Sequence, residues 1–496
     1  MNFPLLSAQE AARLIKDKEV LGIGGFSSVG TPKLVPMALA EYARELHLEG
    51  KEFKVGLITG GAAGSLIDGA LAQADAVFMR TPFQSDKDMR NSINNGKVAY
   101  FDLHLSHIGQ DVRYGFLPKI DVAIIEASDI TAEGEITLST SVGISPTLVQ
   151  QADRVIVELN RVHKGKLKGM HDIFLLDNPP YRKEIPIYRV NDRVGSCTLK
   201  VDPKKIVAVV ESEVKDRIAP FTPLNETTQR IGNNVAAFLL NEWRKGGIPK
   251  EFLPLQSGVG NVANAVLGAL GEDTHLPAFS MFTEVIQNSV IDLMMKERIS
   301  FATGSSLTLS EDKLDMMYEN LDFFKERILL RPQEITNHPE MVRRLGIIAV
   351  NTALEADIFG NVNSTHVMGS KMMNGIGGSA DFSRNAFLSI FTTPSTAKDG
   401  LISSIVPQVS HVDSTEHDVR VLVTEQGVAD LRGKSPKERA ACIIENCAHP
   451  DYKELLWDYV KLSEGKGYHT PFSLKNALKM HLAFAETGDM RNTKYE

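Results

Sequence analysis

Hydrophobic positions along the chain follow two spacings, one typical of buried strands and the other of helices. Short apolar runs at 54–59, 76–80, 121–127 and 154–159 predict strands, and helical patterns separate several of them. Such alternation is expected for parallel sheets whose strands are joined by crossover helices. We therefore predict an α/β protein built from open sheets.

One break in this pattern indicates a domain boundary. After a predicted strand at 205–210, the segment 212–225 is charged and contains proline, and a helical pattern then begins at 226 and continues to 244. The chain has 496 residues, which is ample material for two separate cores. We predict domains at 1–215 and 226–496, with helix and strand patterns alternating again in the second.

Charge and cysteine content narrow the possible partners and compartment. The formal net charge of −8 argues against a surface that follows nucleic-acid phosphates, which needs a basic excess. Only three cysteines occur, so a disulfide framework is not expected and a reducing cytoplasm is the natural setting. The N-terminus lacks the pattern of a signal peptide, and no apolar run is long enough to predict a membrane span.

Glu284 is the first candidate for chemistry. It follows the apolar run 278–283, a predicted strand, and precedes a helical pattern at 288–296. Open α/β sheets bind their ligands at the carboxyl ends of strands, so a carboxylate there is a candidate nucleophile. The alternative is an ordinary acid at a helix start, stabilised by the helix dipole.

Two glycine-rich segments favour the catalytic interpretation. Residues 373–382 contain Gly375, Gly377 and Gly378, and residues 256–262 form a similar loop ahead of a helical pattern. Bare backbone N–H groups can approach an anion or a developing oxyanion without obstruction. We expect Gly378 to adopt a conformation that only glycine reaches easily, although each loop could also be a simple turn.

Other motifs give weaker indications of function. The glycines after Gly22 fail the dinucleotide pattern because Ser27 stands where its third glycine belongs. Lys398 lies in an S-x-x-K segment without the other β-lactamase motifs, and it is either a phosphate-binding cation or a solvated lysine. Glu425, just past a predicted strand, either lines the same site as Glu284 or caps a turn.

Histidines gather in two places, at His104 and His107 and at His411 and His417 with Asp413 between them. Neither group has the spacing of a known zinc motif. We interpret them as surface or supporting histidines rather than as metal ligands.

Five blocks of sequence together resemble the acetyl-CoA hydrolase/transferase family, whose members are class I CoA-transferases. The blocks are residues 256–262, 282–287, 331–339, 372–382 and 423–432. The resemblance covers nearly the whole chain, and the most similar type of member transfers CoA between succinyl-CoA and acetate. Ala380 departs from the pattern, where a glycine is expected, and adds only a methyl group.

The resemblance implies two open-sheet α/β CoA-transferase domains, an acyl-CoA site in the cleft between them, and a homodimer. It implies that Glu284 is the nucleophile, and that the backbone N–H groups of Val259 and Gly378 form the oxyanion hole. Asn337 and Glu425 would support the active site. The residues implied to surround CoA or to contact a carboxylate are Gly258, Val259, Gly260, Asn261, Val262, Asn374, Gly378, Lys398 and Arg217.

The implied activity moves CoA between an acyl-CoA, either succinyl-CoA or acetyl-CoA, and a small carboxylate through a glutamyl-CoA thioester. CoA is then a substrate, and no metal or redox cofactor is expected. The alternatives are acetyl-CoA hydrolysis, in which water replaces the second acid, and transfer between propionyl-CoA and succinate. A different class, a CoA-binding regulator without turnover, is disfavoured by a glutamate at position 284.

Overall fold

The computed structural model describes residues 3–218, 224–464 and 469–496, which form two compact units. The first contains the described residues of the ranges 1–220, 280–345 and 374–381, and the second contains those of 221–279, 346–373 and 382–496. Segment 280–345 thus packs in the first unit, although it lies within the second predicted domain. The boundary predicted between residues 215 and 226 stays a prediction.

A nine-stranded sheet organises the first unit, in the order β4-β3-β2-β1-β5-β6-β8, with β7 pairing to β5 and β9. Strands β1, β2, β3, β5, β7 and β9 pair in parallel, as the alternating pattern predicts. The strands are β1 (Val20–Ile23), β2 (Val55–Thr59), β3 (Val77–Thr81), β4 (Ala99–Tyr100), β5 (Val122–Ile130), β6 (Glu135–Leu138), β7 (Arg154–Asn160), β8 (Leu199–Lys200) and β9 (Ile206–Ser212).

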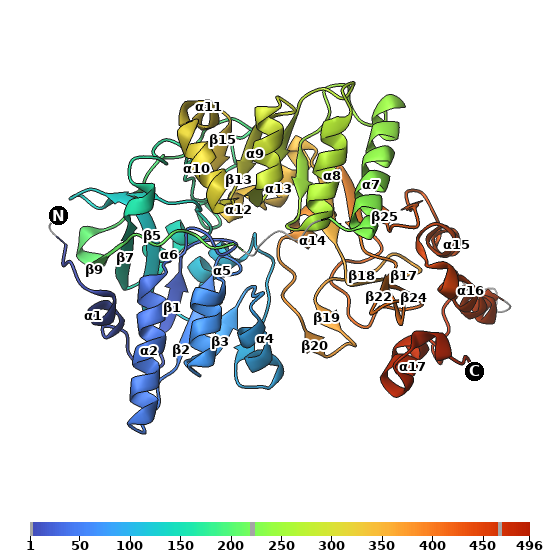
Figure 1. The fold of residues 1–496 in the computed structure, drawn as a ribbon, viewed down its shortest axis with the longest axis horizontal. Coiled ribbons are helices and arrows are strands. Elements are labelled where there is room, and N and C mark those ends of the chain that lie inside the picture. Colours follow the sequence, from blue (N-terminus) through green and yellow to red (C-terminus); the bar gives the residue numbers. More distant parts are fainter. Residues whose placement is uncertain (1–2, 219–223, 465–468) are drawn as a thin grey trace. The chain divides into compact units, whose positions relative to one another are not determined.

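Helices cover this sheet and close its core. Helix α1 (Ala8–Ala12) begins at a capping box formed by Ser7 and Glu10, and α2 (Leu34–Leu48) buries its apolar residues with those of β1 and β2 (Figure 1). The remaining helices of this region are α3 (Ala70–Gln73), α4 (Lys87–Asn94), α5 (Ile108–Tyr114) and α6 (Ser145–Gln151). Strands β1 and β2 are buried at every position and consist almost entirely of apolar residues, as expected for strands covered on both faces.

The segment that follows residue 279 adds a second group of elements to this unit. Strand β11 (Phe279–Phe282) leads to β12 (Val285–Gln287) and then to helix α9 (Asn288–Met295). The short strand β12 pairs in parallel with β14 (Ser306–Thr308). Also present are β13 (Ile299–Gly304), β15 (Ile328–Leu330), α10 (Glu311–Glu319), α11 (Leu321–Lys325), α12 (Gln333–Thr336) and α13 (Pro339–Leu345).

The second unit is built on strands in the order β10-β16-β21-β25-β26, of which the first four pair in parallel. Helices α7 (Glu226–Arg244) and α8 (Asn261–Glu272) lie side by side in Figure 1. The strands are β10 (Leu255–Ser257), β16 (Ile348–Thr352), β21 (Leu388–Thr392), β25 (Val421–Val423) and β26 (Val428–Asp430). The C-terminal helices are α15 (Pro436–Cys447), α16 (Pro450–Glu464) and α17 (Lys479–Thr487).

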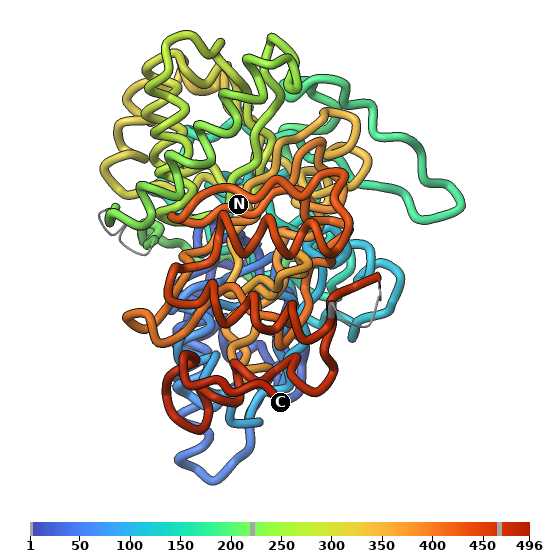
Figure 2. The backbone as a smooth tube through the Cα atoms, turned by 90° about the vertical axis from the view of Figure 1, so that its right-hand side faces the viewer, coloured from blue at the N-terminus to red at the C-terminus, as the bar shows by residue number. Residues whose placement is uncertain are grey.

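Between β7 and β8 the chain makes a long excursion, drawn in green in Figure 2. A β-bridge between Ile173 and Ser196 joins its two arms. Tyr181 and Tyr188 on this excursion are 77% and 62% exposed. In the part of the chain that the structure describes, no helix combines the length and the apolar character needed to cross a membrane.

Candidate active site

Glu284 lies where its sequence context predicts, two residues past the end of the buried strand β11. Its backbone C=O accepts hydrogen bonds from the N–H groups of Ser305 and Ser306, at 2.7 and 3.1 Å. The pairing of β12 with β14 holds the next three residues. The main chain of Glu284 is therefore fixed on both sides. The short strand β12, which the sequence did not predict, separates Glu284 from α9.

Asn337 is the direct partner of the Glu284 carboxylate. Its Nδ2 donates to Oε1 of Glu284 at 2.5 Å, while its Oδ1 accepts from the Thr336 hydroxyl at 2.9 Å. Asn337 directly follows α12, whose first residue, Gln333, donates to the backbone C=O groups of Gly60 and Leu105. Buried hydrogen bonds thus hold the helix that presents the amide.

The block 331–339 is held at further points. Arg331 is fully buried and donates hydrogen bonds to the carboxylate of Asp172 and to the backbone C=O of Asp192. Glu334 receives a bidentate pair from Arg113, at 2.8 and 2.6 Å. These contacts satisfy buried polar side chains of the block and anchor the segment that carries Asn337.

Gly378 completes this cluster within the first unit. A Cβ at this position would clash with Oε1 of Glu284 and Nδ2 of Asn337, and would lie 2.6 Å from Cδ of Glu284. The expected left-handed conformation belongs to the neighbouring Gly377, with φ of 62°, and not to Gly378. Glycine is needed at 378 for space, because the backbone approaches the carboxylate too closely for any side chain.

Val285, the residue after Glu284, belongs to a small apolar cluster. Val285 packs with Phe26, Leu105 and Phe83. The Glu284 residue keeps partial solvent access, yet enough protein surrounds its carboxyl for desolvation to raise the pKa to about 7. The hydrogen bond from Asn337 lowers this pKa, and the charge of Asp381 raises it.

The raised pKa of Glu284 predicts a pH dependence. The nucleophile predicted from the sequence can attack only when its carboxylate is ionised, so we expect kcat/KM to fall as the pH drops through about 7, the pKa that the site gives Glu284. Initial rates between pH 5.5 and 9, with substrate well below KM, measure this. A rate that stays constant down to pH 5.5 would contradict the assignment of Glu284 as the titrating group.

The loop 256–262 belongs to the second unit. Val259 is 54% exposed, and Gly260, with φ of 118°, precedes α8 as its N-cap. The N–H of Gly258 donates to the C=O of Val350. Asn261 and Val262 form the first turn of α8, so this loop presents backbone at a helix N-terminus, as the sequence predicted.

Two other predicted residues lie in the second unit. Lys398 is exposed at the turn between β22 (Thr396–Ala397) and β23 (Ile402–Ser403), with its ammonium 4.9 Å from the ring centre of Phe484. Glu425 is 9% exposed and accepts from the backbone N–H and the hydroxyl of Ser395. Burial favours the neutral form of Glu425, but these hydrogen bonds outweigh it and lower its pKa.

The remaining predicted residues, Arg217 and Asn374, lie in the first unit. Arg217 is exposed and follows the buried Asp216. The backbone C=O of Asn374 accepts from the Tyr100 hydroxyl at 2.9 Å, whereas its side-chain Oδ1 is buried without a hydrogen-bond partner. Among the predicted site residues, the structure brings Glu284, Asn337 and Gly378 into contact.

The sequence did not single out Asp381 or Ser106 as site residues. The Ser106 hydroxyl donates to Oδ1 of Asp381 at 2.6 Å, and Nδ2 of Asn337 lies 3.4 Å from Oδ2 of Asp381. His104, from the first histidine group, has its Nδ1 4.0 Å from Oδ1 of Asp381. Asp381 lies within the glycine-rich block 373–382, and this was its only signal in the sequence. Nothing in the sequence marks Ser106.

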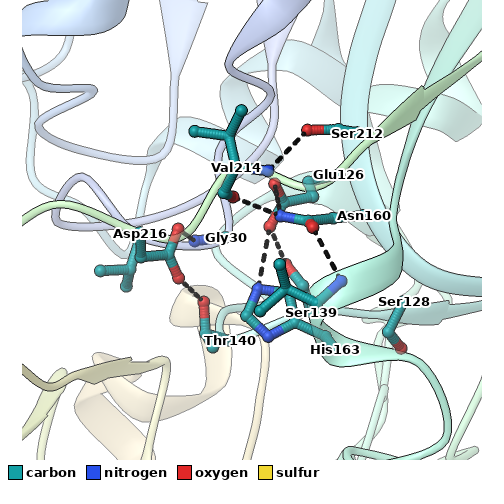
Figure 3. Close-up of polar contacts among 12 residues, drawn as sticks. Gly30, Glu126, Ser128, Ser139, Thr140, Asn160, His163, Ser212, Val214 and Asp216 are labelled. Atoms are coloured by element: carbon teal, nitrogen blue, oxygen red, sulfur yellow. Dashed lines mark hydrogen bonds and ion pairs between the residues drawn. The ribbon is translucent and has the colours of Figure 1, made fainter. Parts of the chain in front are cut away.

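A second polar cluster is buried elsewhere in the first unit (Figure 3). Glu126 accepts from Ser139 at 2.7 Å and from Asn160 at 3.0 Å, and Nε2 of His163 lies 3.8 Å from its Oε1. Asp216 accepts from the Thr140 hydroxyl and from the N–H of Gly30. Among the described residues, Glu126, His163 and Asp216 form the one group whose atoms are close enough to hold a metal ion.

A lysine side chain supplies the cation of this cluster. Nζ of Lys33 lies 2.5 Å from Glu126 and 2.8 Å from Asp216. Burial favours the neutral form of each carboxyl group, and it raises the pKa of Glu126. At Asp216, the charge of the Lys33 ammonium and its hydrogen bond outweigh burial and lower the pKa. Because the ammonium already lies between the carboxylates, we do not propose a metal there.

Replacement of Lys33 by Met should be strongly destabilising. It leaves two buried carboxylates without their cation, for which a loss of about 3–5 kcal/mol is expected at neutral pH. The loss should shrink in acid, where the carboxylates are protonated. Urea unfolding followed by fluorescence measures it, with Lys51→Met, which removes an exposed ion pair with Glu49, as the control. Equal unfolding midpoints for the two variants would contradict a stabilising role for the cluster.

Comparison with known proteins identifies the family and the fold of this chain. A family model described as the acetyl-CoA hydrolase/transferase N-terminal domain matches residues 3–211, and its C-terminal counterpart matches residues 314–460. The fold, a mixed α/β structure with several open sheets, is shared with RipA from Yersinia pestis, with a TM-score of 0.70 and 22% identity over 93% of this chain and 98% of that one.

Curated relatives extend over almost the whole chain. The succinyl-CoA:acetate CoA-transferase of Clostridium kluyveri is 49% identical, covering 98% of this chain and 90% of that protein. The propanoyl-CoA:succinate CoA transferase of Escherichia coli is 47% identical, covering 98% of each. The acetyl-CoA hydrolase of Candida glabrata is 44% identical, covering 97% of this chain and 94% of that protein. The chain belongs to the acetyl-CoA hydrolase/transferase family and is an enzyme, which confirms the resemblance predicted from its sequence blocks.

Proposed function

We propose that this enzyme transfers CoA between an acyl-CoA, succinyl-CoA or acetyl-CoA, and a small carboxylate such as acetate or succinate, through a thioester on Glu284. The observation that carries the proposal is the Glu284 carboxylate itself. It accepts a hydrogen bond from Asn337 and abuts the backbone of Gly378. A desolvated, basic carboxylate beside bare backbone is suited to covalent attack on a carbonyl.

The proposed reaction balances without any other reactant. A Glu284 oxygen attacks the thioester carbonyl, a C–O bond forms, and CoA leaves as a thiolate, giving an acyl-glutamyl anhydride. The thiolate then attacks the glutamyl carbonyl and expels the acyl group as a carboxylate, leaving glutamyl-CoA. A second carboxylate reverses both steps and regenerates Glu284. No electrons are exchanged, so no redox cofactor or metal is part of the proposal.

The tetrahedral oxyanions of these steps need hydrogen-bond donors. We propose the backbone N–H groups of Gly378 and Val259 for this role. The close approach of the Gly378 backbone to Glu284 supports the role of Gly378, and the exposed loop before α8 supports that of Val259. Glu425, whose carboxylate two hydrogen bonds from Ser395 hold in place, supports the site in this proposal.

Binding of CoA is proposed for the loop 258–262, Asn374, Gly378 and Lys398, and Arg217 is proposed to contact a carboxylate or CoA. The exposed ammonium of Lys398 suits a phosphate, and the orphaned Oδ1 of Asn374 is available to a ligand donor. The family resemblance also supports a homodimer, which sedimentation can test. The cytoplasmic compartment expected from the cysteine content stays a prediction.

One experiment tests the covalent step and another the choice of acceptor. Incubation with acyl-CoA but no acceptor, followed by borohydride reduction and peptide mass spectrometry, should mark Glu284. Acetate should accelerate the consumption of succinyl-CoA severalfold. If a different residue is marked, Glu284 is not the nucleophile. If CoA release is equally fast without any acid, acetyl-CoA hydrolysis is favoured. Propionyl-CoA with succinate as acceptor tests the other transfer.

A further inference from the structure

Asp381 occupies a buried position between two separate parts of the first unit. It lies in the first turn of α14 (Ser379–Asn385) and is 5% exposed. Ser106 holds its carboxylate twice, through the backbone N–H to Oδ2 at 3.0 Å and through the hydroxyl to Oδ1 at 2.6 Å. Oδ2 also faces Nδ2 of Asn337 at 3.4 Å. The carboxylate is therefore fixed independently of Glu284.

The Asn337 amide has a donor end and an acceptor end, and only one orientation suits its surroundings. Its acceptor Oδ1 receives the Thr336 hydroxyl, and its donor Nδ2 faces both Glu284 and Asp381. A reversed amide would direct Oδ1 at two carboxylates. In the resting enzyme, both acids therefore favour the same orientation.

The two acids differ once the reaction begins. Glu284 loses its negative charge when it becomes an anhydride or a thioester, so it then holds the amide only weakly. Asp381 takes no part in the bond changes and keeps its charge. We propose that Asp381 is a positioning residue that keeps the donor end of Asn337 aimed at Glu284 through every covalent stage of the reaction. This inference rests on the proposed covalent role of Glu284.

The charge of Asp381 has a second consequence at Glu284. Burial is the main cause that raises the pKa of Glu284, and Asp381 adds to it. Burial likewise raises the pKa of Asp381, to about 6, against the hydrogen bonds from Ser106 and Asn337 and the charge of His107. Glu284, His104 and His107 are the titratable groups that face Asp381. Loss of this charge should make Glu284 more acidic and less nucleophilic.

Asp381→Asn tests the inference because it preserves shape and removes charge. We expect kcat to fall about 10- to 100-fold, and the acidic limb of the kcat/KM profile to move about one unit lower in pH. Ser106→Ala is the matched control, because it removes one hydrogen bond to Asp381 but leaves its charge. Its pH limb should stay in place. A folded Asp381→Asn enzyme with an unchanged rate and pH limb would overturn the inference.

Two further variants separate positioning from structure. In an Asn337→Ala background, Asp381→Asn should still shift the pH limb but lower kcat much less than it does in the wild type, because the amide that it orients is gone and only the weaker nucleophilicity of Glu284 remains. Additive losses in kcat would overturn the positioning role. If Asp381→Asn does not fold, Asp381→Glu takes its place. It keeps the charge, so it should retain the pH limb while lowering kcat, and a shifted limb would refute the inference.

A measurement on the unaltered enzyme distinguishes failure of this inference from failure of the proposed function. If acyl-CoA alone does not load CoA onto Glu284 in the wild-type protein, the covalent proposal fails, and the positioning role fails with it. If loading occurs in the wild type and Asp381→Asn loads at the same rate with the same pH limb, only the role of Asp381 is refuted.

Discussion

Glu284→Gln should lower turnover by on the order of 10⁴-fold or more, the size of loss seen when a covalent nucleophile is removed. Glutamine keeps the shape of the side chain and can still accept a hydrogen bond from Asn337, but a neutral amide does not attack a thioester. The variant should retain its fold, because burial disfavours the ionised form of Glu284 and the substitution removes that charge. Rates of CoA transfer from succinyl-CoA to acetate measure the effect.

Two controls make this result specific. Glu284→Asp keeps the carboxylate but withdraws it by one methylene, so we expect a partial loss rather than complete inactivity. Neither Glu284→Gln nor Glu284→Ala should give a borohydride-sensitive adduct at position 284. Turnover of Glu284→Gln within tenfold of the wild type would show that another group forms the covalent intermediate, provided that mass spectrometry excludes deamidation of the glutamine.

Much of the fold could be predicted because strong local signals agree with the tertiary structure. The helix predicted at 226–244 has those bounds, since Asn225 caps it and a continuous amphipathic pattern follows. Strands β2 and β5 of the first unit begin with apolar runs and are buried at nearly every position. Short strands such as β12 and β14 were not predicted, because three residues that pair with a distant segment have no periodicity of their own.

The site was partly predictable for a similar reason. Glu284 and Gly378 lie in segments whose local pattern indicates chemistry, and the family resemblance added Asn337. The contact of Ser106 with Asp381 joins residues 275 positions apart, and that of Lys33 with Glu126 joins residues 93 positions apart. Lys33 follows a proline at a helix start, where a lysine is ordinarily solvated. Only tertiary packing reveals that these side chains are buried partners.

Gly378→Ala should reduce turnover by about 10²-fold or more, and Gly378→Val by a larger factor. The added Cβ would occupy space now filled by Oε1 of Glu284 and Nδ2 of Asn337, so the carboxylate must rotate away or the backbone must withdraw. Either change moves the proposed oxyanion donor relative to the reacting carbonyl, and loss of one such donor elsewhere has cost about 10²–10³ in kcat. Since φ at 378 is outside the left-handed region, backbone strain does not contribute.

The control for Gly378 is another glycine whose Cβ has room. Gly268 lies within α8, and a Cβ there meets no atom within 4 Å, so Gly268→Ala should retain full activity and stabilise the helix slightly. Circular dichroism and thermal melting verify that both variants fold, and steady-state transfer assays compare their kcat and KM. If folded Gly378→Ala and Gly378→Val enzymes turn over at the wild-type rate, the close approach of this backbone to Glu284 has no part in catalysis. The oxyanion-stabilising donor must then come from another backbone segment, for which the loop at 258–262 is the first candidate.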